Sequence, residues 1–540
     1  MLFAVVLIAL HAPLLRLPYF WDEAGYYIPA ARDLFSGSLI PYSTPSNAHP
    51  PLVMAWLVLA WKIFGQSQLV TRSAMLLLAA FSLLGFFRLA RTVANSAVAV
   101  CSTLLVAIYP VFFAQSSLAQ VDLPAAGLIF WGLEAYFRKK LMGARASSPA
   151  LAWFSLAALA KETAILIPVA LILWELGGRF ISTSRPSVAK AAKQEAPRIG
   201  TTETRALPVP PDRTTPRMRV ANIGLLLTPG IPLALWYAYH YARTGFVFGN
   251  PEFFRYNVQS TLHPLRILLA LLLRIWQTVG YLDLYVLTLA CVIAMTFAPI
   301  KDAHGERPRI AIPVQFAFLA IAVVYLLSLS IVGGAVLARY MLPIVPLVIL
   351  VCVSTIWRRL RAWKAVIAVI ALAFISALFI NPPYGFSPED NLAYRDYIHL
   401  HQHAERFLEQ RYSTARVLTA WPASDELTRP YLGYITKPMQ VVKIEDFSAE
   451  QVLSAADARS RFDVALVFST KYQPEHTIFD HWRTWQEWKS RYFGYHVDLT
   501  PQVAASVLGG NVVYAEHRRG QWVGIIEMQK IEEAKLSVAH

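Results

Sequence analysis

Charged residues are scarce in this chain of 540 residues, and cysteine is nearly absent. Only 15% of the residues are charged, whereas soluble domains carry about 25%. The three cysteines, Cys101, Cys291 and Cys352, each lie within an apolar run. Their spacing fits neither a disulfide framework nor a cysteine-based zinc site. The composition therefore argues against a soluble protein and against one held together by disulfides.

A glycine-rich phosphate loop is also missing, so an ATP-driven reaction has no support. The net charge of +15 would suggest nucleic-acid binding in a soluble protein. Here the basic residues form clusters between apolar runs, as in membrane proteins whose orientation is set by Lys and Arg. We therefore expect a lipid bilayer as the environment and no nucleic-acid partner.

Long apolar runs dominate residues 1–380 and predict a polytopic α-helical membrane protein, because a spanning helix needs about 20 mostly apolar residues. Two runs, 51–65 and 265–276, are short and carry Lys62 or Arg266 and Arg274. We interpret these two as interfacial helices on the outer surface. The other runs predict about eleven spans, at 2–17, 70–90, 95–113, 122–137, 149–161, 163–177, 220–241, 278–298, 311–331, 340–356 and 363–380.

With this arrangement every basic cluster falls on one side of the membrane, which we assign to the cytoplasm of a bacterial inner membrane. The largest cluster is the stretch 178–219, with nine basic residues and six prolines. We interpret it as a disordered cytoplasmic loop that sets the topology, although its charge would also attract anionic lipid headgroups. The N-terminus is then expected inside, and everything after Asn381 outside.

From residue 381 the composition becomes mixed, which predicts a small extracytoplasmic α/β domain at 381–540. Strand-like runs occur at 416–420, 464–468 and 512–515, and helix-like runs at 449–458 and 482–492. Three tryptophans repeat at three-residue intervals, Trp482, Trp485 and Trp488. This spacing favours packing of a helix onto the domain, and stacking of the rings on a sugar is the alternative. Three histidines alternate along the chain, His399, His401 and His403. On a strand they would lie on one side and could gather a metal ion. No carboxylate or Cys nearby in the sequence completes such a site, so we interpret them as exposed histidines of a linker.

Two adjacent acids, Asp22 and Glu23, open the first predicted outer loop beside Tyr26 and Tyr27. Charge so near a span is costly and usually marks a function or a buried pair. Asp122 lies at the outer end of the fourth predicted span, on the same side. A solvated loop pair would explain the first two acids but not the aromatic residues around them, and a helix N-cap would explain Asp122 alone. We predict that these carboxylates converge on one outer cavity.

Cationic groups are predicted on the same side of the membrane. A cavity with carboxylates near one wall and cations near the other suits a substrate that carries a phosphate beside a polar acceptor. Two alternatives stay open, because Lys161 could pair with Glu162 and Arg339 could extend to the membrane interface. The predicted cationic set is His49, Lys161, Arg255 and Arg339, the last followed by Tyr340.

These elements together resemble a known family. The Trp-Asp-Glu sequence at 21–23, the His-Pro-Pro sequence at 49–51, Asp122, Lys161 and the Arg339–Tyr340 pair are similar to the polyprenyl-phosphate-sugar-dependent glycosyltransferases of the GT-C class. The nearest groups are the protein O-mannosyltransferases and the lipid A aminoarabinose transferases. The resemblance covers residues 1–380 and implies a multispan GT-C-like bundle with interfacial helices in its first outer loop.

The resemblance implies inverting transfer of a sugar from a polyprenyl-phosphate donor to a lipid, glycan or protein acceptor outside the membrane. The family's first-loop Asp, matching Asp22, acts as general base or orients the acceptor, and Glu23 supports it. Lys161 and Arg339 match residues that contact the phosphate. We add Asp122 to the catalytic set, His49 and Arg255 to the phosphate-binding set, and three tyrosines to the substrate lining, Tyr26, Tyr27 and Tyr340.

The sequence leaves the acceptor, the sugar and the cofactor open. The aminoarabinose group has Lys where His49 stands, and the O-mannosyltransferases carry a large insertion that this chain lacks. Outer-loop carboxylates can hold Mg²⁺ or Mn²⁺, so a divalent cation is a candidate cofactor, but no ligand set is complete. A transporter or lipid flippase is a competing class, although no internal repeat is evident and the acids lie at one face. A non-catalytic scaffold for envelope assembly is the third.

Overall fold

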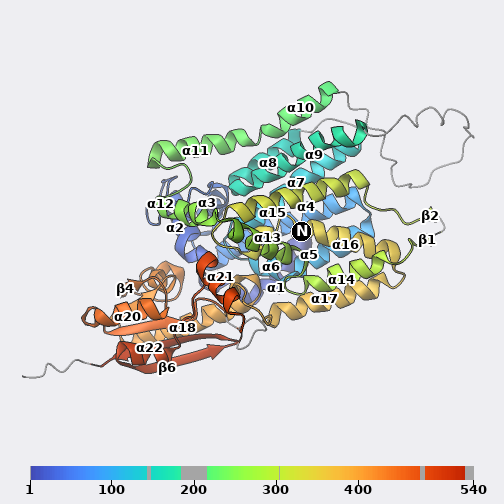
Figure 1. The fold of residues 1–540 in the computed structure, drawn as a ribbon. Helices are drawn as coiled ribbons and strands as arrows, with labels where there is room; N and C mark the ends of the chain where they lie inside the picture. The colour runs from blue at the N-terminus through green and yellow to red at the C-terminus, as the bar shows by residue number, and fades with distance from the viewer. Residues whose placement is uncertain are drawn as a thin grey trace, which may run out of the picture.

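The computed structural model describes residues 2–142, 148–183, 216–302, 305–472, 474 and 481–529. Most of the basic stretch 178–219 lies outside these residues, so its predicted disorder is not addressed. Figure 1 shows a large bundle of helices and, against one end of it, a smaller part that contains a β-sheet. The bundle is built from residues before 380, and the sheet from residues after 415.

The helices before residue 380 form two groups. Those of the first group follow the runs that were predicted to span the membrane. They are α1 (Leu2–His11), α4 (Gln68–Val93), α5 (Ser96–Ile108), α7 (Asp122–Leu141), α8 (Ser148–Ala160), α9 (Leu166–Thr183), α10 (Pro216–Leu227), α11 (Gly230–Thr244), α14 (Leu284–Met295), α15 (Ile312–Ile331), α16 (Val345–Arg359) and α17 (Trp363–Phe379). The second group consists of α2 (Ile28–Phe35), α3 (Leu52–Phe64), α6 (Pro110–Gln115), α12 (Pro251–Asn257) and α13 (Pro264–Val279), which has 16 residues.

Local sequence explains where several of these helices begin and how closely they pack. Ser67 caps α4 by accepting a hydrogen bond from the Val70 amide, and Asn95 caps α5 in the same way. Gly127 on α7 faces Ser82 on α4, where an added Cβ would lie 1.9 Å from the serine Oγ. Only glycine therefore permits the close contact of α4 with α7.

Two of the described helices, α4 and α15, are long and apolar enough to cross a membrane. A third crossing results if the segment 251–261 and α13, which meet at 92°, form one broken span or re-entrant loop. Six further apolar helices have 10–17 residues. The count of eleven spans therefore stays a prediction. The run 265–276, predicted to lie flat on the membrane, belongs to this bent pair, and the run 51–65 forms α3.

The sheet has five strands in the order β4-β3-β5-β7-β6. The first three are parallel, and β7 and β6 continue the sheet in antiparallel pairing. Every residue of the central strand β5 is buried, as expected for a strand covered on both faces. The strands are β3 (Arg416–Ala420), β4 (Gln440–Ile444), β5 (Val464–Phe468), β6 (Gly510–Arg518) and β7 (Gln521–Met528). The predictions at 416–420 and 464–468 are confirmed, 512–515 is part of β6, and β4 and β7 were not predicted.

The helices that accompany the sheet are α18 (Ala393–Arg411), α19 (Ala423–Glu426), α20 (Ala449–Asp457), α21 (Arg483–Phe493) and α22 (Pro501–Leu508). Those predicted at 449–458 and 482–492 are present as α20 and α21. Trp485 and Trp488 are half-buried, and the Trp482 and Trp485 rings stack with their centroids 6.2 Å apart, so packing of α21 onto the domain through these tryptophans stays a prediction. The three histidines lie on α18 rather than on a strand, so their alternating spacing points them in different directions around a helix.

One hydrophobic core joins the first loop to the sheet-containing part. It includes Phe20 and Tyr27 from the first loop, Tyr397 from α18 and Val417 from β3. The Tyr397 ring lies 5.2 Å from Phe20 and 5.7 Å from Trp21. The loop that carries Asp22 and Glu23 therefore packs between the bundle and the residues that follow 381.

Candidate functional site

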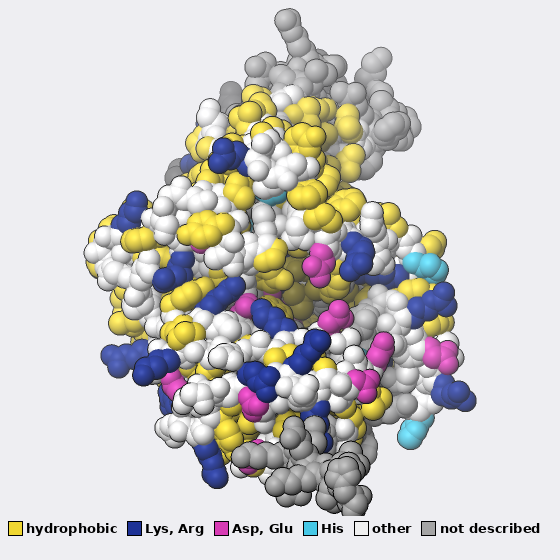
Figure 2. All heavy atoms as spheres, turned by 90° about the vertical axis from the view of Figure 1, so that its left-hand side faces the viewer, with side chains coloured by type: hydrophobic (Ala, Val, Ile, Leu, Met, Phe, Trp, Pro, Cys, Tyr) yellow, Lys and Arg dark blue, Asp and Glu magenta, His cyan; other side chains and the backbone are white. Residues whose placement is uncertain are grey.

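A cavity of about 690 Å³ lies where the bundle meets the sheet-containing part. Figure 2 shows a hollow in this face of the molecule, with hydrophobic side chains at its floor and Asp, Glu, Lys and Arg around its rim. Both parts of the chain contribute to the cavity wall. The bundle side includes Asp22, Tyr26, Tyr27, His49, Lys161, Arg339 and Tyr340, and the other side includes Glu389, Asp390, Trp421, Asp446, Lys471 and His496.

Arg339 holds the acids of this site together. It lies in the 3₁₀ turn η5 (Ala338–Met341) that precedes α16, and its side chain is buried. Its guanidinium forms ion pairs with Asp22 and Glu389, and its Nε lies 3.2 Å from Oδ2 of Asp122. The Asp22 side chain is 20% exposed, whereas Asp122 and Glu389 are 3% and 2% exposed. Of the three carboxylates, Asp22 is therefore the most accessible to a substrate in the cavity.

Three cations surround the ring of Tyr340. The Lys161 Nζ lies 4.0 Å from the ring centroid, and the Arg274 and Arg339 guanidinium carbons lie 5.4 and 5.5 Å from it. Contacts of this kind are attractive through the ring quadrupole. Arg274 comes from α13 and donates to the backbone oxygens of Leu337 and Ala335. The positive charge thus gathers at one side of the cavity, beside the acids held by Arg339.

The two alternatives raised for Lys161 and Asp122 are wrong. Lys161 pairs with Asp122, while the Glu162 carboxylate contacts Nδ1 of His49 at 2.9 Å. Asp122 is the first residue of α7 and does not cap it, because the N-cap position belongs to Val121. The alternative for Arg339 is also wrong, since its side chain turns inward to three carboxylates instead of reaching the membrane interface.

Glu23 has a different environment from its neighbour Asp22. It is fully buried and does not line the cavity. Its carboxylate accepts from the Phe20 amide at 2.9 Å and pairs with Arg72 at 3.2 Å. Arg72 also donates to the backbone oxygens of Leu17, Pro18 and Ser117. This geometry makes Glu23 a support for the first loop.

The structure brings together most of the predicted site residues and leaves two apart. Arg255 is exposed on α12 and lies outside the cavity lining, as Glu23 does. Asp122 does not line the cavity but contacts two residues that do. The residues that the structure unites are Asp22, Asp122, Tyr26, Tyr27, His49, Lys161, Arg339 and Tyr340.

Sequence reasoning missed Arg274, Glu389 and Asp390. Glu389 and Asp390 form a second adjacent acid pair close after an apolar run, the same signal that identified Asp22 and Glu23. Burial, and then the nearby Glu389, raise the pKa of Asp390 from 3.8 to about 8. The Tyr281 hydroxyl donates to Asp390 at 2.6 Å. Arg274 was visible as a charge within an apolar run, but only the fold places it beside Tyr340.

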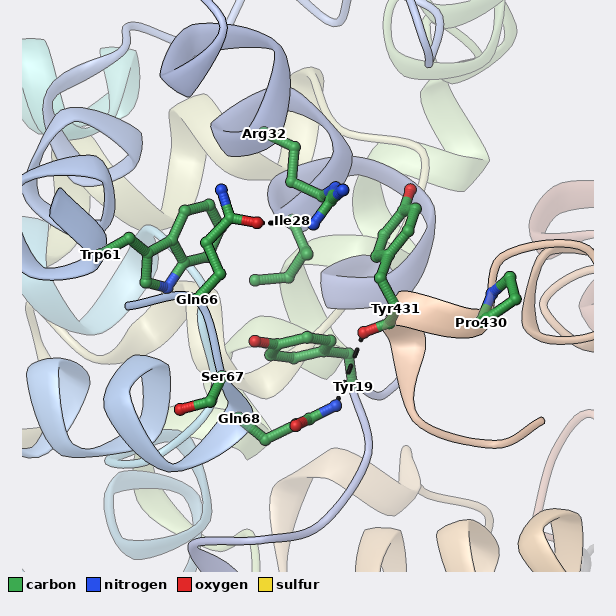
Figure 3. Close-up of a pocket in the computed structure, with 9 residues that line it drawn as sticks. All are labelled: Tyr19, Ile28, Arg32, Trp61, Gln66, Ser67, Gln68, Pro430 and Tyr431. Carbon is green, nitrogen blue, oxygen red and sulfur yellow. Dashed lines mark hydrogen bonds between the residues drawn. The ribbon is translucent and has the colours of Figure 1, made fainter. Parts of the chain in front are cut away.

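A second, smaller cavity of about 240 Å³ lies between the first loop and the turn at Pro430–Leu432 (Figure 3). Arg32 stacks on the Tyr431 ring at 4.1 Å and donates to Gln66 at 2.7 Å. No acidic residue lines this cavity among the described residues, so it offers no candidate base.

The divalent cation considered for the first-loop acids has no ligand set among the described cavity residues. Asp22, Asp122 and Glu389 already pair with Arg339, and Asp122 also pairs with Lys161. Because Arg339 and Lys161 already neutralise these carboxylates, little negative charge remains to bind a metal ion.

We expect the pKa of Asp390 to make stability depend on pH. Between pH about 4 and pH about 8 the native state keeps a proton that the unfolded state has lost. The free energy of unfolding should therefore fall as pH rises through this window, by about 1.4 kcal/mol per pH unit at most. Asp390→Asn should make this slope shallower in thermal unfolding of the detergent-purified protein at pH 5 to 8. Asp457→Asn, at an exposed position on α20, should retain it; equal slopes in wild type and Asp390→Asn would contradict the assignment.

Comparison with known proteins agrees with this architecture. A family model described as dolichyl-phosphate-mannose-protein mannosyltransferase matches residues 48–191. The structure of ArnT from Cupriavidus metallidurans bound to undecaprenyl phosphate is similar with a TM-score of 0.53 and 13% identity, over 97% of each chain. The Archaeoglobus fulgidus oligosaccharyltransferase in complex with Zn and sulfate aligns at a TM-score of 0.43 and 12% identity, over 94% of this chain and 69% of that one, too low to carry an argument. No curated protein matches the chain. The family match over residues 48–191 and the fold shared with ArnT confirm the predicted resemblance to the GT-C class at the level of the fold, that of a polytopic helical membrane protein.

Proposed function

We propose that the chain is an integral membrane glycosyltransferase that moves a sugar from a polyprenyl-phosphate donor to an acceptor outside the membrane. One observation carries the proposal: the partly exposed carboxylate of Asp22 is held by buried Arg339 in a cavity that also presents Lys161. A base and a cation side by side suit displacement of a phosphate by a hydroxyl. The similar ArnT structure contains undecaprenyl phosphate, which supports a lipid-linked donor.

The reaction would be a single displacement at the anomeric carbon. The acceptor oxygen forms a bond to this carbon while the bond from the carbon to the phosphate oxygen breaks, and its electron pair leaves with the polyprenyl phosphate. The acceptor proton passes to Asp22, which acts as general base. Attack opposite the leaving group inverts the anomeric configuration. The ion pair with Arg339 fixes the orientation of the Asp22 carboxylate in the cavity.

The leaving phosphate gains negative charge, which Lys161 is placed to stabilise directly, whereas Arg274 does not line the cavity and adds positive charge beside the Tyr340 ring. Lys161 lines the cavity and has one carboxylate partner, Asp122. The hydrogen-bond acceptors of Arg274 among the described residues are backbone oxygens and Gln277, so no carboxylate neutralises it there. Arg339 was predicted to contact the phosphate, but its three carboxylates favour a positioning role. Preorganised cations at a departing phosphate lower the barrier directly.

The direction of α7 supports an outward-facing site. Asp122 begins this helix at the cavity, and Arg138, Lys139 and Lys140 form its last turn. At a rise of 1.5 Å per residue, Asp122 and Leu141 lie on the order of 28 Å apart along the helix axis. Because basic residues mark the cytoplasmic ends of spans, the cavity belongs to the opposite side. Nucleotide sugars are confined to the cytoplasm, so an outer site calls for a lipid-linked donor.

Asp22→Asn should lower sugar transfer by about 10²–10⁴-fold, because the amide keeps the shape but cannot accept the proton. The measurement is single-turnover transfer by the purified protein with a polyprenyl-phosphate sugar. Glu23→Gln is the comparison: it weakens the buried pair with Arg72 and should lower the free energy of unfolding, by about 3–5 kcal/mol. Wild-type turnover of a folded Asp22→Asn protein would exclude the general-base role.

Lys161→Met should weaken binding of polyprenyl phosphate by about 30- to 1000-fold, equivalent to about 2–4 kcal/mol for a buried charged contact. Binding of labelled undecaprenyl phosphate in detergent measures this effect. Arg255→Met is the matched control, since Arg255 was predicted to bind phosphate but lies outside the cavity lining. Unchanged affinity in Lys161→Met, or an equal loss in Arg255→Met, would remove the phosphate site from the proposal.

Single-cysteine labelling tests the sidedness. With Cys101, Cys291 and Cys352 replaced, a cysteine at exposed Ser506 on α22 should react with an impermeant maleimide in intact spheroplasts. A cysteine at exposed Ser96, at the start of α5 near Arg91, should react only after permeabilisation. The reverse pattern would place the cavity in the cytoplasm.

A further inference from the structure

A second cluster of ionisable side chains is buried beneath the sheet, apart from the cavity. His401 and Glu405 lie one turn apart on α18, and Glu426 is the last residue of α19. Their exposed fractions are 1%, 0% and 0%. Nδ1 of His401 lies 2.6 Å from Oε2 of Glu426 and 3.7 Å from Oε1 of Glu405. None of the three lines the cavity described above.

The cluster has polar atoms that protein partners do not satisfy. Both carboxyl oxygens of Glu405, Oε1 of Glu426 and Nε2 of His401 are buried without a hydrogen-bond partner. The hydroxyl of Tyr397, whose ring stacks on His401 at 4.0 Å, is also unpartnered. Buried polar groups normally have partners, so several orphans at one point indicate a missing ligand. As carboxylates, Glu405 and Glu426 can only accept, and they cannot satisfy each other.

The charge of the cluster points to a cation. Among the described residues, the ion pairs of Glu405 and Glu426 involve His401 alone. Burial, then the neighbouring Glu426 and last Glu409, both acids, raise the pKa of Glu405 well above its usual value. One imidazolium cannot neutralise two buried carboxylates. Either a proton or a divalent cation must supply the remaining positive charge.

We propose that His401, Glu405 and Glu426 bind a divalent metal ion, with Zn²⁺ preferred. One ligand atom from each residue lies within 4.8 Å of the others, so small side-chain movements would let all three approach one ion at Zn²⁺ ligand distances of about 2.0–2.2 Å. An imidazole with two carboxylates suits Zn²⁺ better than Mg²⁺ or Ca²⁺, which favour sets of oxygen ligands. Nδ1 of His401, which faces both carboxylates, is the nitrogen ligand.

The ion would have a structural role. It would tie α18 to α19, and α18 carries Tyr397, which packs against Phe20 and Trp21 of the first loop. Metal binding would therefore stabilise the surface against which the loop carrying Asp22 rests. The proposal does not depend on the reaction at the cavity and would stand if that function were wrong.

The test uses the full-length protein purified in detergent with a tag that contains no histidine. After chelator treatment and removal of the chelator, ZnCl₂ is titrated, and bound metal is measured by mass spectrometry. Wild type should retain about one Zn²⁺ per chain and unfold at a higher temperature with Zn²⁺ than without it. His401→Gln and Glu426→Gln should lose both effects. His403→Gln should keep them, because His403 lies on the same helix but is partly exposed and pairs with Glu516.

A measurement on wild type alone keeps the proposal falsifiable if these variants do not fold. Co²⁺ bound by one imidazole and two carboxylates should give visible absorption bands that Zn²⁺ abolishes. Absence of both retained Zn²⁺ and Co²⁺ bands in folded wild-type protein would overturn the proposal and leave a shared proton as the counter-charge. Retention by His401→Gln equal to wild type, or stabilisation by Mg²⁺ as strong as by Zn²⁺, would also overturn it.

Discussion

The buried guanidinium of Arg339 is the constraint on which the site depends. Its three carboxylate partners come from the first loop, the start of α7 and the segment after α17. An unpaired buried charge is strongly destabilising, so losing one partner affects the whole assembly. Four segments that are far apart in the sequence are therefore held at one point. Asp22, the most exposed of the acids, gains a fixed position from this arrangement while still facing the cavity.

A second buried ion pair supports the first loop from behind. Arg72 binds Glu23 and three backbone oxygens, while Phe20 packs against Tyr397. Asp22 and Glu23 thus point to different partners although they are adjacent in sequence. The π-helical turn that begins at Glu23 separates their directions. One acid supports the backbone, and the other is presented to the cavity.

The sheet-containing part closes the cavity on its other side. Gly25 in the first loop touches Trp421, where an added Cβ would lie 2.7 Å from the indole Nε1. Trp421 and Lys471 line the cavity together with Asp22 and Lys161. An acceptor that reaches Asp22 would contact both parts of the chain, which links the choice of acceptor to the residues after 381. The buried cluster around His401 lies behind this wall.

The sequence by itself determined the membrane class, the two acids of the first loop, the cations Lys161 and Arg339 and the strands at 416–420 and 464–468. These features depend on hydropathy, alternation and short motifs, which are local and can be read directly. Only the tertiary structure decided that Lys161 pairs with Asp122, that Glu23 pairs with Arg72 and that Glu389 joins Arg339. It also placed His401 beside Glu405 and Glu426, because the three histidines lie on a helix and one of them faces the core. Ion pairs between distant segments depend on how the helices pack, and packing is set by the whole chain at once.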